Sequence, residues 1–187
     1  GSGSASRSIE GPLVVWGEHP EILGSSDVFG VQFPYKVHSV FENYQDAILL
    51  VDKGEKQVSS TVGHNLMHTH PFAENRFKQA NENLSKMSKI LQEGDSKAFI
   101  NLVESEALTL HAMMLTSNPY FILMKPNTLE IIHKIWEYRK ENNSNICFSA
   151  LQRLFPFRGA CVRCLGQLPE HVVCFQCVSL ATFVPNP

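Results

Sequence analysis

Between Pro71 and Lys140 the apolar residues recur every three or four positions, which is the spacing of one helix face. The first such stretch begins at Pro71, because the first turn of a helix tolerates proline. It ends at Gly94, since glycine readily adopts the left-handed backbone that terminates a helix. Asp95 can then cap the next helix through its carboxylate. The apolar stripe of the first helix comprises Phe77, Ala80, Leu84, Met87 and Leu91.

A second helix is predicted over residues 95–116 and a third over residues 128–140. Because only Gly94 separates the first two helices, we expect them to form an antiparallel hairpin. His111 and His133 lie within these helices and are expected to be either packed or solvent-facing. The predicted apolar faces are Phe99, Leu102, Ala107 and Leu110 in the second helix, and Leu129, Ile132, Ile135 and Trp136 in the third.

Short apolar runs on either side of the helices predict strands. They are Leu13–Trp16, Ala47–Val51 and Ile146–Phe148, and the last two should belong to the sheet under the helix hairpin. Strands with helices packed on one side give an α+β fold. We expect incomplete layers in residues 1–148, with apolar surface near Leu13, Val14 and Val31 left uncovered.

Composition excludes several functional classes. The chain has 43% hydrophobic and 18% charged residues, which is typical of a packed protein. Its net charge is −2 and it has no long basic run, so we expect neither a nucleic-acid nor a membrane partner. No apolar stretch approaches the ~20 residues that cross a bilayer, and no signal peptide is evident. These features favour a cytoplasmic protein. The chain does not begin with Met, so it either opens with a cloning linker or starts in the middle of a gene.

The opening segment Gly1-Ser2-Gly3-Ser4-Ala5-Ser6 can serve an anion-binding function. Small residues before a helix let a phosphate approach the backbone N–H groups, which favour negative charge. Arg7 adds a planar guanidinium suited to a carboxylate or phosphate. The same Gly-Ser repeat is also typical of a cloning linker.

The fuller string Gly1-Ser-Gly-Ser-Ala-Ser-Arg-Ser-Ile9, followed by Val15-Trp16-Gly17, resembles the signature of mevalonate diphosphate decarboxylases. These enzymes belong to the superfamily of galactokinase, homoserine kinase and mevalonate kinase. The block Val58-Ser-Ser-Thr-Val-Gly63 supports the resemblance, as does Glu104-Ser-Glu-Ala-Leu-Thr-Leu-His111. The resemblance covers residues 1–148. It implies a partial two-domain, small-molecule-kinase-superfamily fold that is truncated: the end of the N-terminal domain and a helix-rich α/β sandwich.

On this resemblance, the domains would be residues 1–44 (the end of the nucleotide and substrate domain), 45–148 (a partial C-terminal α+β domain) and 149–187 (a Cys-rich tail of unknown origin). The enzyme would use ATP and Mg²⁺ to convert mevalonate 5-diphosphate to isopentenyl diphosphate in isoprenoid biosynthesis. The full-length enzyme would be a homodimer. A related small-molecule kinase of the same superfamily is the alternative.

The resemblance also assigns roles to individual residues. Arg7 would be catalytic by holding the substrate carboxylate, while Ser2, Gly3 and Ser4 would line the pocket between substrate and nucleotide phosphates. Ser60 would contact the substrate diphosphate. The family's catalytic aspartate should follow Phe148 in a Thr/Ser-x-Asp-Ala-Gly context, but no Asp occurs after Asp95. We therefore expect the fragment to be inactive alone.

The five cysteines are confined to the last 41 residues. Cys161, Cys164, Cys174 and Cys177 form two Cys-x-x-Cys pairs, the usual layout of a tetrahedral zinc site, although the gap between the pairs is short. His171 could compete as a ligand. The tail is then either a zinc-binding interaction module or an unrelated sequence with chance cysteines. His64, His68 and His70 form another cluster, which is better explained as a loop between strand and helix.

Overall fold

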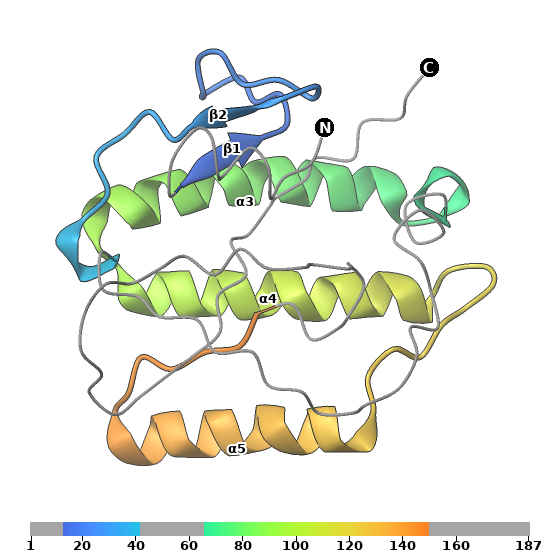
Figure 1. Ribbon diagram of the computed structural model, residues 1–187. Helices are drawn as coiled ribbons and strands as arrows, with labels where there is room; N and C mark the ends of the chain where they lie inside the picture. Colours follow the sequence, from blue (N-terminus) through green and yellow to red (C-terminus); the bar gives the residue numbers. More distant parts are fainter. Residues whose placement is uncertain (1–12, 42–65, 150–187) are drawn as a thin grey trace.

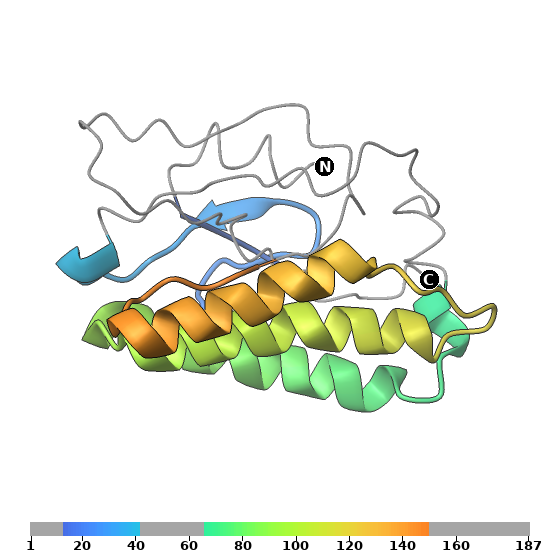
Figure 2. The ribbon, with the colours of Figure 1, turned by 90° about the horizontal axis from the view of Figure 1, so that it is seen from below.

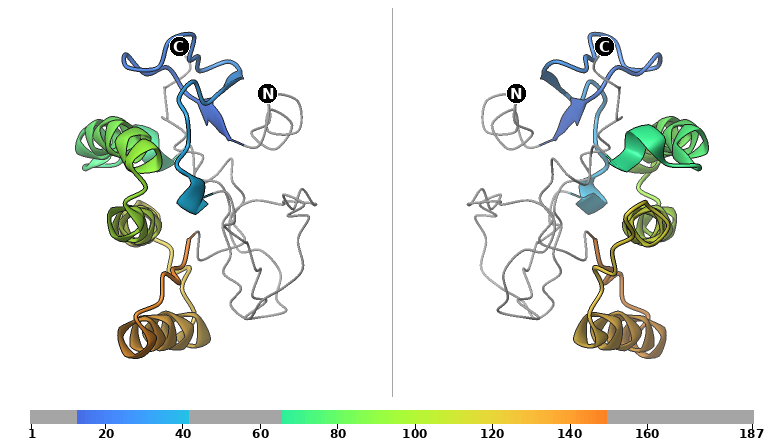
Figure 3. Two further views of the ribbon diagram at one scale, coloured as in Figure 1. Left: turned by 90° about the vertical axis from the view of Figure 1, so that its left-hand side faces the viewer. Right: turned by 90° about the vertical axis from the view of Figure 1, so that its right-hand side faces the viewer.

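A computed structural model describes residues 13–41 and 66–149 of the chain (Figure 1). The three long helices lie side by side in one layer, with α4 between α3 and α5 (Figure 1). The short strands β1 and β2 lie on one side of this layer, close to α3 (Figures 2 and 3). In chain order the elements are β1 Val14–Trp16, β2 Gly30–Gln32, the 3₁₀ turns η1 Ser39–Phe41 and η2 Met67–Thr69, and then α3 Ala73–Glu93, α4 Ser96–Leu115 and α5 Pro126–Asn142.

The α3–α4 hairpin confirms the prediction made from Gly94 and Asp95. Gly94 has φ +80°, and its N–H donates to the Ile90 carbonyl at 2.9 Å, which ends α3. The Asp95 carboxylate accepts from the Ala98 N–H at 2.9 Å and caps α4. The predicted start of α3 is wrong by two residues, because Pro71 lies in the preceding turn and the helix begins at Ala73.

One apolar cluster joins the hairpin to the strands. Four of the five predicted stripe residues of α3 are buried, three of them in this cluster, and Phe77 is half-buried against a second cluster. The cluster extends to Val15 on β1 and to Val103 on α4. Leu13 and Val31, where uncovered apolar surface was predicted, are partly buried against this cluster, and Val14 beside them is half-buried. Val15 pairs with Val31 in an antiparallel ladder, and both pack in the cluster with residues of α3 and α4.

The loop between β1 and β2 is attached to α3 by a buried histidine. The Glu21 N–H donates to His19 Nδ1 at 3.2 Å, so the other ring nitrogen carries the proton. His19 Nε2 then donates to the Asn81 carbonyl at 3.1 Å. The exposed apolar side chains of this region are Leu23, Val28 and Phe29, which lie further along the same loop.

Helix α5 confirms the third predicted helix and extends it by two residues at each end. Ile132 is buried as expected, whereas Leu129 and Trp136 are more exposed than the predicted apolar face implies. Ile132 packs with Ala107 of α4 and with Phe148 in a separate cluster. None of the described helices is long and apolar enough to cross a membrane.

The predicted strand at Ile146–Phe148 is wrong, because none of these residues belongs to a strand. The Ile146 carbonyl accepts a hydrogen bond from the Arg139 side chain, and Cys147 and Phe148 are buried. Phe148 packs with Ala107 of α4 and Ile132 of α5, so its apolar character reflects packing on helices. The predicted strand Ala47–Val51 lies outside the described residues.

Comparing Gly94 with Gly24 tests how strongly the stability of the protein depends on glycine in the α3–α4 turn. Both Gly24 and Gly94 have positive φ, +79° and +80°. A Cβ on Gly94 would lie 2.5 Å from His38 Nδ1, whereas a Cβ on Gly24 would meet nothing within 4 Å. We expect Gly94→Ala to lower the free energy of unfolding by about 3 kcal/mol, and Gly24→Ala by about 1 kcal/mol, in urea denaturation. Equal losses in the two variants would show that His38 simply moves aside.

Candidate functional site

The site residues predicted from the sequence lie outside the described part of the chain and remain predictions. They are Ser2, Gly3, Ser4, Arg7 and Ser60, together with the possible zinc ligands Cys161, Cys164, Cys174 and Cys177. His64 and His171 also lie outside it. The structure instead shows two buried glutamates of α4 that pair with arginines of α3 and α5.

Glu106 of α4 is buried against α3. Arg76 donates to both carboxylate oxygens, with Nη1 to Oε1 at 3.1 Å and Nη2 to Oε2 as a second contact. Asn83 Nδ2 adds a hydrogen bond to Oε1 at 2.6 Å. The carboxylate is thus fully engaged by α3 and has no free oxygen to act as a base.

Glu104 is buried on the other side of α4, against α5. Arg139 donates from Nη1 to Oε1 at 2.6 Å and from Nη2 to Oε2 at 3.0 Å, and Trp136 Nε1 donates to Oε2 at 2.9 Å. The hydrogen bond to Glu104 raises the pKa of Arg139 above its usual range, so the guanidinium stays charged. The same Arg139 Nη1 also donates to the Ile146 carbonyl at 2.9 Å.

The segment after α5 is held firmly by this arrangement. Cys147 has no exposed surface, and burial raises the pKa of its thiol to about 12, so it is not a nucleophile at neutral pH. The Phe148 ring lies 6.0 Å from that of Trp136, centroid to centroid. The chain is therefore fixed up to the point where the family resemblance leads us to expect a catalytic aspartate.

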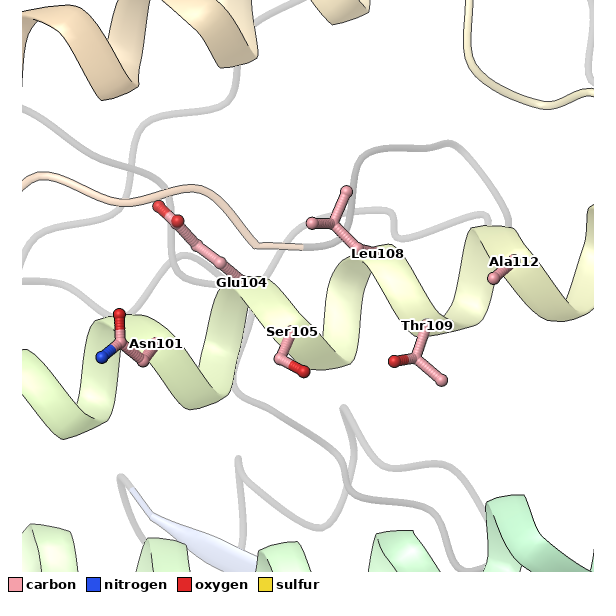
Figure 4. A pocket seen from close by; sticks show the side chains of 6 residues that line it. All are labelled: Asn101, Glu104, Ser105, Leu108, Thr109 and Ala112. Atoms are coloured by element: carbon pink, nitrogen blue, oxygen red, sulfur yellow. The ribbon is translucent and has the colours of Figure 1, made fainter.

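A shallow groove of about 450 Å³ runs along α4 (Figure 4). Its one charged group is Glu104, which is already paired with Arg139. The groove is open, and its lining offers hydroxyl and amide groups without a free acid or base. It is lined by one face of the helix: Asn101, Glu104, Ser105, Leu108, Thr109 and Ala112.

His70 has a structural role rather than a metal-binding one. The Phe72 N–H donates to its Nδ1 at 3.1 Å, so Nε2 carries the proton and donates to the Met113 carbonyl at 3.0 Å. His68, two residues away, is exposed. Within residues 13–41 and 66–149, no group of three or more His, Cys, Asp or Glu side chains could hold a metal ion.

His111 of α4 is packed, the first of the two predicted alternatives, and is only 2% exposed. Neither ring nitrogen has a hydrogen-bond partner, and burial lowers the pKa of the imidazole to about 4. The ring is therefore neutral at physiological pH. His133 of α5 is exposed, with its ring edge-on to that of Trp136.

Glu104 and Glu106 are buried, paired groups that were not predicted from the sequence. A signal was present, because two carboxylates two positions apart interrupt an otherwise apolar helix and cannot both face the same solvent side. Their arginine partners lie 30 and 35 residues away in the sequence, beyond any local pattern.

Comparison with known proteins identifies the family. Residues 47–149, more than half of the chain, match the family described as the mevalonate 5-diphosphate decarboxylase C-terminal domain. A diphosphomevalonate decarboxylase from Ganoderma lucidum is 29% identical over 142 residues, which cover 75% of this chain and 35% of that protein. The chain thus spans about a third of the length of this relative.

Solved structures show the same fold. The mevalonate pyrophosphate decarboxylase of Streptococcus pyogenes matches with a TM-score of 0.55 and 22% identity, over 67% of this chain and 38% of that one. The mevalonate diphosphate decarboxylase of Legionella pneumophila matches with a TM-score of 0.53 and 23% identity, over 65% and 38% of the two chains. The expected partial α+β fold is confirmed.

Because His111 is buried and neutral, we expect the free energy of unfolding to fall at acid pH. Its folded-state pKa lies below the unfolded value, so the unfolded chain binds the proton more readily, and stability falls as the pH drops from about 6.5 to about 4. Between pH 8 and pH 5 we expect this group to cost on the order of 2 kcal/mol. In urea denaturation, His111→Leu should remove that part of the pH dependence.

Met113→Leu is the matched control, since Met113 is buried on the same helix and does not titrate. It should shift stability equally at pH 8 and pH 5. If His111→Leu kept the full pH dependence of the parent, the histidine would not be its source.

Proposed function

Since the chain belongs to the family of the mevalonate 5-diphosphate decarboxylase C-terminal domain, we propose that it is part of an enzyme that converts mevalonate 5-diphosphate to isopentenyl diphosphate in isoprenoid biosynthesis. The family match over residues 47–149 is the observation that carries this proposal. It also favours a decarboxylase over a related small-molecule kinase. Because the chain spans 35% of the length of the Ganoderma lucidum relative, the activity is proposed for the longer protein.

The proposed chemistry makes a poor leaving group into a good one. ATP transfers its terminal phosphoryl group to the tertiary hydroxyl of the substrate, giving ADP and a tertiary phosphate ester. The C–O bond then breaks, phosphate leaves with the bonding electrons, and positive charge develops on carbon. The adjacent C–C bond supplies an electron pair to form the double bond, and the carboxylate leaves as CO₂.

The residues proposed for this chemistry follow the family resemblance. Arg7 would pair with the substrate carboxylate through its two-pronged guanidinium, and Ser60 would bind the substrate diphosphate. Ser2, Gly3 and Ser4 would leave room for phosphates to approach backbone N–H groups. Mg²⁺ would enter with ATP and neutralise charge on the transferring phosphate.

The described helices would act as the support for this site. We propose domains at residues 1–44 and 45–148, with 149–187 as a separate tail in which zinc binding by the cysteines remains a prediction. The full-length enzyme would be a cytoplasmic homodimer. Its substrates are small anions, so the proposal requires neither a nucleic-acid nor a membrane partner.

The proposal predicts the outcome of an activity assay. The 187-residue chain alone should release no measurable ADP or CO₂ from ATP and mevalonate 5-diphosphate, because phosphoryl transfer needs nucleotide, metal and acceptor aligned together. A chimera should be active if residues 1–148 are joined to the flanking parts of the Ganoderma lucidum relative, including the Thr/Ser-x-Asp-Ala-Gly continuation. Arg7→Ala in this chimera should lower kcat/KM by about 100-fold or more.

Lys97→Ala is the control for loss of positive charge, because Lys97 is exposed on α4. It should leave turnover unchanged. Turnover by the 187-residue chain that survives Arg7→Ala would contradict the assignment of the active site, and an inactive chimera that is folded would contradict the proposed reaction.

A further inference from the structure

We infer that Glu104 and Arg139 are positioning residues that fix the backbone of Ile146–Ser149 on the helix layer, and so set the point from which the active-site continuation begins. This inference deepens the proposed function and rests on it for its catalytic meaning. The physical claim, that the Arg139 side chain contributes to holding this backbone segment, can be tested without any substrate.

The first argument is the geometry of the guanidinium. Two hydrogen bonds to Glu104, at 2.6 and 3.0 Å, fix the plane of the Arg139 head group. Trp136 Nε1 donates to the same carboxylate at 2.9 Å and holds it from the α5 side. With its plane fixed, Arg139 directs Nη1 at the Ile146 carbonyl, 2.9 Å away.

The second argument is the path of the chain. Asn143 has φ +47°, which turns the backbone back at the end of α5, and the Ser144 N–H donates to the Arg139 carbonyl at 3.3 Å. The Ile146 N–H then donates to Ser144 Oγ at 3.2 Å. The backbone is thus bonded at Ser144 and again at Ile146, and the buried side chains of Cys147 and Phe148 follow directly.

The third argument is a comparison of the two arginine–glutamate pairs. Their carboxylates are equally buried, with 9% of each glutamate side chain exposed, and the arginines are 17% and 23% exposed. The guanidinium of Arg76 donates to two side chains, Gln79 of α3 and Glu106 of α4. Arg139 in addition donates to a backbone carbonyl beyond the helices. The family match ends at residue 149, which is the last residue of this segment.

The experiment uses Cys147 as a reporter in the intact chain. After a pulse of N-ethylmaleimide and trypsin digestion, the peptide of residues 141–153 carries Cys147 as its one cysteine, separate from the tail cysteines. In the parent protein, labelling should be slow because the thiol is buried. Arg139→Ala should accelerate it about 100-fold, and Arg139→Lys about 10-fold, since lysine keeps the charge without the fork.

Arg76→Ala is the matched control. It breaks an equally buried pair on the opposite side of α4, so a general loss of stability would act in both variants. Labelling rates measured at several low urea concentrations separate the two cases. Local release in Arg139→Ala should be nearly independent of urea, whereas labelling through global unfolding should follow the full urea dependence of unfolding.

The inference is overturned if Arg139→Ala leaves Cys147 as protected as in the parent. It is also overturned if Arg76→Ala accelerates labelling equally, with the same urea dependence. Should Arg139→Ala fail to fold, Arg139→Lys against Arg76→Lys decides the question by the same comparison. An inactive chimera would contradict the proposed reaction while leaving this labelling result standing, so the two failures are distinguishable.

Discussion

The structure depends on how the central helix accommodates two buried carboxylates. Helix α4 is covered by α3 on one side and α5 on the other (Figure 1), so Glu104 and Glu106 cannot both reach open solvent. Two positions apart on a helix means roughly opposite directions, since each residue advances by about 100°. Each glutamate therefore meets a different neighbour, and each neighbour supplies an arginine. Removing either arginine would leave a buried charge without a partner, which typically costs about 3–5 kcal/mol.

This arrangement specifies the register of the helices more than it adds stability. A buried ion pair recovers its desolvation cost only when the geometry is good, and a guanidinium meets a carboxylate well in few orientations. The turn at Gly94 therefore has to set the position of α4 along the axis of α3 so that Glu106 contacts Arg76. The close approach of His38 to Gly94 explains why this turn uses glycine. Turn, register and charge pairing thus favour the same alignment of α3 and α4.

The sequence predicted the parts of the fold that local rules control. Apolar spacing located the three helices, and Gly94 and Asp95 located the turn between them, because these signals lie within a few residues of each other. The same rules failed at Ile146–Phe148, where an apolar triplet has the composition of a strand but forms none, and Phe148 packs against α4 and α5. Periodicity cannot distinguish a buried strand from an apolar segment packed on helices, because the same side chains are buried in both. Nor could it pair Glu104 with Arg139, since that contact forms only once α4 and α5 have packed. For the candidate site, the serine-rich motif and Arg7 came from family resemblance and lie outside the described residues, so the structure leaves those roles as proposals.

Holding Ile146 by a side chain rather than by a strand has a mechanical consequence. In a sheet, the position of a segment is set by its neighbouring strands through several backbone bonds. Here the Ile146 carbonyl depends on Arg139, whose plane is in turn set by Glu104 on α4. A shift of α4 against α5 would therefore be passed directly to the segment that leads into the proposed active site. Because a misplacement of about 1 Å can cost a hundredfold in rate, such a linkage requires a rigid pair. Two hydrogen bonds from Arg139 and one from Trp136 to the Glu104 carboxylate supply that rigidity. The Phe148 ring packs against Trp136, so the segment also contacts the same group of side chains.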